Sequence, residues 1–251
     1  MKRNPNHIVG IYNYCDRWCE RCTFTSRCAV FASEKNLSPE QNDITNKVFW
    51  DNISNIFAEA VIELKKAADA NDISLDDIDE AEMKAYDEKI KTDSEEMKKH
   101  PLIKYCREYM DAAKHLLDTN TTIKNKGETD LQLIELGLKD VAETKLIFQN
   151  IADNLEIIQW YLFQILVKFM RALPTFDDDE DFEMSDDSNG SAKVALIATD
   201  RCLQAWQNII KLLPALEDDT IPLLALLQKI KKIGLVTFPN AMAFVRLGLD
   251  E

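Results

Sequence analysis

The recurrence of apolar residues at spacings of three and four is the feature that most limits how this chain can fold. Between residues 39 and 70, such positions share one face of a helix: Ile44, Val48, Phe49, Ile53, Ile56, Phe57, Ala60, Val61 and Leu64. Only six glycines and seven prolines interrupt 251 residues, which leaves few places for the turns of a sheet. We therefore predict an all-α fold, an irregular multi-helix bundle with an N-terminal four-cysteine loop.

Local signals predict where some of these helices begin and end. Ser38 followed three residues later by Gln41 is typical of a helix start, because each side chain can bond a free N–H at the first turn. We expect later helices to end at Gly127 and at Gly234. A long apolar segment is expected to bend or break near residues 150–154.

The chain is expected to divide into two regions. Residues 1–36 form a cysteine-rich metal-binding loop, and residues 37–251 form a helical bundle domain. The acidic run at 176–190, FDDDEDFEMSDDSNG, has no apolar periodicity. We expect it to be a solvated loop of the bundle domain.

Four cysteines lie within 14 residues, with the spacing C-x3-C-x2-C-x5-C: Cys15, Cys19, Cys22 and Cys28. Disulfides are disfavoured, because bonds between cysteines this close would form small strained loops and nothing indicates an oxidising compartment. A structural zinc ion can be bound by four thiolates, but these usually come from two pairs of cysteines that are separated in sequence. An iron–sulfur cluster commonly takes its cysteines from one compact loop, so a 4Fe–4S cluster is favoured and zinc stays open as the alternative.

The charge of the chain is divided unevenly. The formal net charge is −14, yet residues 1–35 hold six basic and three acidic residues. Arg17, Arg21 and Arg27 alternate with the cysteines and can offset the negative charge of a thiolate-bound metal. The acidic remainder disfavours extended nucleic-acid binding, whereas the basic N-terminal segment could contact a protein partner.

The cysteine segment partly resembles a known iron–sulfur motif. Residues 19–28, CERCTFTSRC, are similar to the C-x2-C-x5-C portion of the SPASM-type auxiliary motif of some radical enzymes, but position 32 is Ala where that motif has its next cysteine. No parallel-sheet domain follows, so the resemblance does not imply radical chemistry. The whole chain also resembles a group of uncharacterised bacterial proteins that share a YCDRWCERC-type start, which implies no activity.

A second candidate site is a narrow polar stripe on an otherwise apolar helix. Residues within about 120° of one another on that helix are Asp153, Glu156, Gln164, Lys168 and Arg171. The helix after the acidic run offers Lys193, Asp200 and Arg201 as partners. The stripe is interpreted as an interhelical ion-pair network or, alternatively, as a polar pocket for a small ligand.

The remaining cysteines and the histidines add little chemistry. Cys106 and Cys202 lie among apolar residues, which predicts buried inert thiols. A di-iron bundle requires histidines three residues after glutamates. None of the three histidines has that position, and no catalytic triad order or phosphate-binding glycine loop is present.

These observations lead to one preferred function and two alternatives. The preferred one is an iron–sulfur protein in electron transfer, redox sensing or partner assembly. The alternatives are a non-enzymatic interaction module with structural zinc, and a helical enzyme or small-ligand binder that uses the polar stripe. Polar residues interrupt the most apolar segment, 155–173, so no membrane span is expected, and a cytoplasmic location is inferred.

Overall fold

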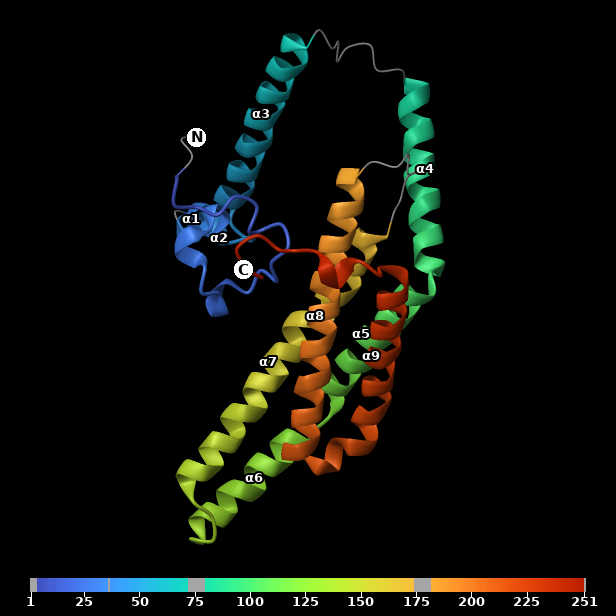
Figure 1. The fold of residues 1–251 in the computed structure, drawn as a ribbon. Coiled ribbons are helices and arrows are strands. Elements are labelled where there is room, and N and C mark those ends of the chain that lie inside the picture. Colours follow the sequence, from blue (N-terminus) through green and yellow to red (C-terminus); the bar gives the residue numbers. More distant parts are fainter. Residues whose placement is uncertain (1–3, 36, 72–79, 174–181, 251) are drawn as a thin grey trace. The chain divides into compact units, whose positions relative to one another are not determined.

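The computed structural model describes residues 4–35, 37–71, 80–173 and 182–250 (Figure 1). All regular elements in this part of the chain are helical, so the predicted all-α class is confirmed. The chain divides into two compact units. Unit 1 comprises Met1–Tyr12 and Cys19–Thr92, and unit 2 comprises Asn13–Trp18 and Asp93–Glu251.

Unit 1 contains two short 3-10 turns and a series of helices. Their bounds are η1 Cys19–Arg21, η2 Thr25–Arg27, α1 Ala29–Lys35, α2 Pro39–Asn42, α3 Lys47–Ala70 and the first part of α4 Glu80–Lys99. The predicted start at Ser38 is confirmed, since Ser38 and Gln41 form a reciprocal capping box. The helix that was expected to continue from it is interrupted, because Asp43 bonds Thr45 in a local turn and Asn46 caps α3.

Unit 2 is a bundle of long helices (Figure 1). Their bounds are the end of α4, then α5 Pro101–Thr119, α6 Thr122–Glu135, α7 Val141–Ala172, α8 Phe182–Leu212, η3 Pro214–Leu216, α9 Glu217–Thr237 and η4 Ala241–Ala243. The α7–α8 pair forms the most extensive interface, and its core contains Tyr161, Phe169 and Trp206. Trp206 donates its indole N–H to the Tyr109 hydroxyl at 3.0 Å, so this buried polar group is paired.

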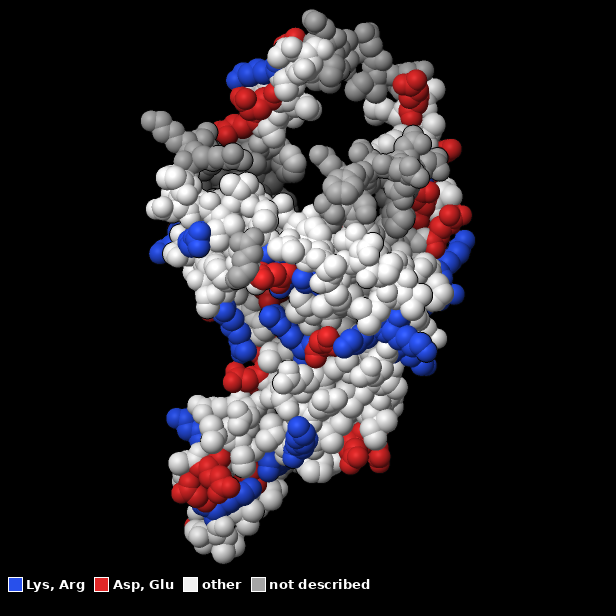
Figure 2. Space-filling view, viewed as in Figure 1, with Lys and Arg blue, Asp and Glu red and all other residues white. Residues whose placement is uncertain are grey.

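The surface of unit 2 carries charges of both signs. Figure 2 shows acidic and basic side chains next to each other at the α6–α7 end. Beneath that surface, the nearly buried carboxylate of Asp130 pairs with Lys126 at 3.1 Å and with Lys139 at 2.5 Å. Because Lys139 lies in the α6–α7 turn and Asp130 lies in α6, their ion pair stabilises the position of the turn against α6.

The two predicted glycine stops are wrong, because both glycines lie inside helices. Gly127 lies within α6, and Gly234 lies within α9. A Cβ at Gly234 would lie 2.9 Å from the Phe169 ring and 3.2 Å from Leu196. The glycine therefore permits the close packing of α9 on α7 and α8 instead of ending the helix.

Two other predicted interruptions are also corrected. The break near residues 150–154 is absent from α7, where Asn154 donates its side-chain N–H to the Asn150 carbonyl within the helix. Residues 182–190 of the predicted acidic loop belong to α8. Two side chains of this stretch have specific partners: Ser188 donates to the Ala172 carbonyl, and Asp187 pairs with the Arg171 guanidinium. Residues 176–181 of that prediction lie outside the described part of the chain.

The C-terminal tail docks onto unit 2. The half-buried segment that follows α9 is held by Lys193 of α8, which donates to the Phe244 carbonyl at 2.5 Å and pairs with Asp250 at 2.7 Å. Arg246 pairs with the same Asp250 carboxylate at 2.7 Å. Lys193 is only 8% exposed, so its charge is compensated by these contacts.

Candidate functional site

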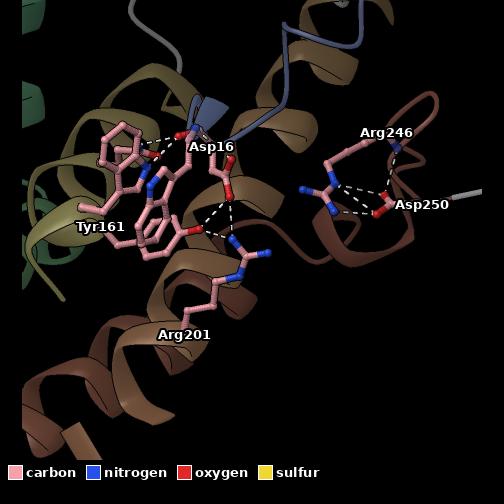
Figure 3. A network of polar contacts seen from close by, with 8 residues as sticks. Asp16, Tyr161, Arg201, Arg246 and Asp250 are labelled. Carbon is pink, nitrogen blue, oxygen red and sulfur yellow. Dashed lines mark hydrogen bonds and ion pairs between the residues drawn. The ribbon is translucent and has the colours of Figure 1, made fainter. Parts of the chain in front are cut away.

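The segment Asn13–Trp18 brings the first predicted metal ligand onto the helices of unit 2. Its central residue is Asp16, which lies between two of the four cysteines in sequence (Figure 3). The Asp16 carboxylate accepts hydrogen bonds from the Tyr161 hydroxyl of α7 and from Arg201 of α8, each at 2.6 Å. Arg201 also donates to the Tyr161 hydroxyl and lies over the Tyr161 ring. We call this three-residue cluster of Asp16, Tyr161 and Arg201 the Asp16 clamp.

The Asp16 clamp alters the protonation of its members. Burial alone would raise the pKa of the Asp16 carboxyl, but hydrogen bonds from Tyr161, from the Trp18 N–H and from Arg201 outweigh burial and lower the pKa. Burial and the neighbouring Asp16 carboxylate raise the pKa of Tyr161. Asp16 is therefore an anion and Tyr161 a neutral donor at neutral pH.

The backbone of the segment is bound as well. The Asp16 carbonyl accepts the indole N–H of Trp160 at 2.9 Å and the side-chain N–H of Gln164 at 2.7 Å. The Trp18 side chain is 5% exposed and stacks on Trp160, with 5.0 Å between ring centroids. The edge of Trp18 also meets Tyr161 at 5.9 Å. Three kinds of contact thus attach this segment to α7 and α8: an ion pair, hydrogen bonds to its backbone and aromatic packing.

Tyr14 forms a second point of attachment. Its hydroxyl donates to Asp187 at 3.0 Å, and Arg171 binds the same carboxylate at 2.7 Å. Its ring packs edge-on against Phe244 of the C-terminal tail at 4.8 Å. The backbone of Gly190 lies against the Tyr14 ring, where a Cβ would come within 2.4 Å. Tyr14 therefore fits a space that only a glycine leaves open.

Cys15 lies between these two attachments and is half-buried. Burial raises the pKa of the Cys15 thiol, while the backbone N–H of Arg17 and the positive charges of Arg17 and Lys168 oppose that rise. Lys168 is half-buried as well, and burial together with the nearby Arg171 lowers the pKa of its ammonium group. Arg17 has a positive φ of 57°, an uncommon backbone conformation for a residue other than glycine.

The other three cysteines of the motif lie in unit 1, and all are half-buried. The sulfur of Cys22 accepts the backbone N–H of Phe24 at 3.4 Å, and that of Cys28 accepts the N–H of Phe31 at 3.5 Å. Cys19 opens η1, and its carbonyl accepts the N–H of Cys22 at 3.2 Å. Local turns therefore direct backbone donors at two of these sulfurs.

Across the described ranges, no group of three or more Cys, His, Asp or Glu side chains is arranged to hold a metal ion. The chemistry of the donor set nevertheless fits a thiolate-bound metal, because backbone N–H groups stabilise the negative charge of sulfur. All six cysteines are free thiols.

Cys106 and Cys202 differ from the four motif cysteines. Both are buried in the core of unit 2, at 1% and 0% exposure. Burial raises the pKa of each thiol to about 12, so neither is a thiolate at neutral pH. The prediction of buried thiols is confirmed.

The structure also places the residues of the predicted polar stripe. Gln164 and Arg201 bind Asp16, Lys168 lies near Cys15, and Arg171 binds Asp187. Asp200, which was considered as a partner of the stripe, pairs with Lys231 of α9 at 2.7 Å. Asp153 and Glu156 lie on the same helix, α7, nearer its middle. Gln164 of the stripe and Arg201, one of its predicted partners, thus bind the chain's own N-terminal segment.

Sequence reasoning missed Asp16, the residue on which this arrangement depends. In the sequence, Asp16 is only one of three acidic residues in a basic segment. A signal is present, since Trp160 and Gln164 share one face of a helix and each can donate a hydrogen bond to a polar partner. The partner is the Asp16 carbonyl, next to the cysteines, and not a group on another helix.

Comparison with known protein families, with curated proteins and with solved structures finds no match to this chain. No helix in the described part of the chain is both long and apolar enough to cross a membrane.

Proposed function

We propose that this protein binds a metal through the thiolates of Cys15, Cys19, Cys22 and Cys28, and that the favoured group is a 4Fe–4S cluster. The observation that carries the proposal is the direction of backbone N–H groups at the sulfurs. Cys15 accepts from Arg17, Cys22 from Phe24 and Cys28 from Phe31. Backbone N–H groups directed at a sulfur stabilise the negative charge that it carries once it is bound to a metal.

The surrounding residues support this proposal electrostatically. Arg17 lies between Cys15 and Cys19, Arg21 directly precedes Cys22, and Arg27 directly precedes Cys28. Lys168 adds a further positive charge near Cys15. Four thiolates around an oxidised four-iron cluster leave a net negative charge that these side chains would offset. When bound, such a cluster exchanges electrons, which would suit electron transfer, redox sensing or assembly with a protein partner.

The Asp16 clamp would give the site one fixed end. Because Asp16 and Trp18 are held by α7 and α8, the adjacent Cys15 has a defined position in unit 2. The remaining ligands lie in a loop that is held by short local hydrogen bonds. Among the four proposed ligands, Cys15 is therefore the one that contacts within unit 2 hold at a defined position.

The test is metal and sulfide analysis of protein purified without oxygen. We expect a brown protein with broad absorbance near ~400 nm and about four iron and four sulfide per chain. Cys22→Ala should lose this chromophore, whereas Cys202→Ala removes a buried thiol and should retain it. Colourless protein with about one zinc per chain would overturn the cluster and establish structural zinc as the alternative. Protein that binds neither metal would overturn both.

We also propose a reducing compartment and a protein partner for this site. A reducing compartment such as the cytoplasm would keep the six free thiols reduced and available. A partner that exchanges electrons with the site, or assembles with it, would meet the basic residues that surround the cysteines. The affinity for such a partner should fall as the salt concentration is raised, because dissolved ions screen the attraction between exposed charges.

A further inference from the structure

Two helices of unit 1 carry exposed rows of large apolar side chains. On α3 the exposed fractions are 67% for Phe57, 50% for Val61 and 59% for Leu64, and on α4 they are 54% for Met83, 56% for Tyr86 and 40% for Ile90. Contiguous exposed apolar residues on a folded protein commonly mark an interface. These rows do not include the cysteines, so the argument is independent of the proposed metal site.

The spacing of the two rows is mirrored. Along α3 the steps from Phe57 to Val61 to Leu64 are four and then three residues, and along α4 the steps from Met83 to Tyr86 to Ile90 are three and then four. Two such rows match when the helices run antiparallel, because every pair then meets at the same height. The pairs are Leu64 with Met83, Val61 with Tyr86 and Phe57 with Ile90.

We infer that the segment 83–90 of α4 packs against the segment 57–64 of α3 as an antiparallel helical hairpin. The occupant of the exposed α3 face is thus a segment of the same chain. The pairing alternates the two core positions of a heptad repeat across the interface, as antiparallel coiled coils do. A hairpin of this kind buries both rows at once.

The chain connection favours α4 over a second copy as the occupant. α3 ends at Ala70 and α4 begins at Glu80, so nine residues join them. Nine residues can span up to about 30 Å, whereas packed helix axes lie about 8–10 Å apart. A short connection gives α4 a high effective concentration at α3, which a separate molecule lacks.

The hairpin is tested by photo-crosslinking in the full chain. Tyr86 is replaced by p-benzoylphenylalanine, and the irradiated protein is separated by size and analysed by peptide mass spectrometry. We expect the crosslink to fall between residues 57 and 64 within one chain, with a yield that does not change on dilution. A crosslinked dimer, attachment to another segment or no crosslink at all would overturn the inference.

A matched pair of variants separates loss of the hairpin from general damage. Val61→Lys places a charge in the inferred interface, whereas Ile62→Lys places it one position away on an equally exposed residue of α3. Val61→Lys should reduce the crosslink yield by roughly tenfold, and Ile62→Lys should leave it nearly unchanged. Equal reduction in both variants, with helix content retained by circular dichroism, would also overturn the inference.

Discussion

The two halves of the cysteine motif are held in different ways. Asn13–Trp18 is fixed by partners far away in sequence, such as Tyr161 and Arg201, through a half-buried carboxylate, two bonds to one carbonyl and stacked aromatic rings. Cys19–Cys28 is shaped by bonds between near neighbours, such as Cys28 to Thr25, and by one bond from Ile8 to Arg27. One short motif therefore combines a segment positioned by tertiary structure with a loop positioned by local turns.

The difference shows why equal spacing in sequence does not give equal rigidity. A residue that is locked by several independent partners keeps its place when one bond breaks. A residue in a small turn depends on one or two bonds, which open at low cost. The first half of the motif should resist perturbation, and the second half should adapt to a ligand.

Removal of one aromatic side chain from each half should give the largest contrast. Trp18→Ala is expected to lower the free energy of unfolding by about 3–5 kcal/mol, because a buried ring that stacks on Trp160 and meets Tyr161 in a T-shaped contact is lost. Phe24→Ala, at a half-buried position in the loop, should cost only about 1 kcal/mol. Urea unfolding measures both, and equal costs would contradict the comparison.

Two glycine substitutions should change stability in opposite directions. Gly190→Ala is expected to lower the free energy of unfolding by about 1–3 kcal/mol, since its Cβ would overlap the Tyr14 ring. Gly127→Ala meets only an ordinary contact at 3.7 Å from Phe148 and should raise stability by about 0.5–1 kcal/mol. Thermal unfolding separates the two signs, and stabilisation by Gly190→Ala would show that Tyr14 is not held tightly.

The smallest expected effect concerns the tail that packs against Tyr14. Hydrogen bonds from Arg246, followed by Lys193, lower the pKa of Asp250, so the unfolded chain binds this proton more readily than the folded chain. The resulting stability is present above the ordinary Asp value of 3.8 and is lost as the pH falls through the lower folded value. Asp250→Asn should remove about 1 kcal/mol at neutral pH and flatten this acid response. A pH series of melting temperatures checks it, and identical slopes in both proteins would contradict it.

The fold class could be predicted because periodicity and few helix breakers act along the whole chain. The helix ends were less predictable, since they depend on tertiary contacts. Gly234 resembles a helix stop in sequence, but its missing Cβ admits Phe169. Asn154 resembles a breaker, but its side chain bonds to the Asn150 carbonyl. The charges at 182–190 resemble a loop until Asp187 is seen to bind Tyr14 and Arg171.

The candidate site was predictable only in part, for a similar reason. Four clustered thiols are visible in sequence because their spacing is short. The contacts that fix the position of Cys15 are not visible in the sequence, because its neighbour Asp16 and the partner Arg201 are 185 residues apart. The polar stripe on α7 indicated that a partner was needed, but a single sequence does not say which of 44 acidic residues supplies it.

The long separation between Asp16 and its partners has a consequence for the order of events during biosynthesis. At about 5–20 residues per second, a ribosome needs roughly 10–40 s to extend the chain from Asp16 to Arg201. Throughout that interval the cysteine segment exists without the complete set of helices that hold it. The thiols are therefore most accessible to metal, to oxidants and to assembly factors while the protein is still being made.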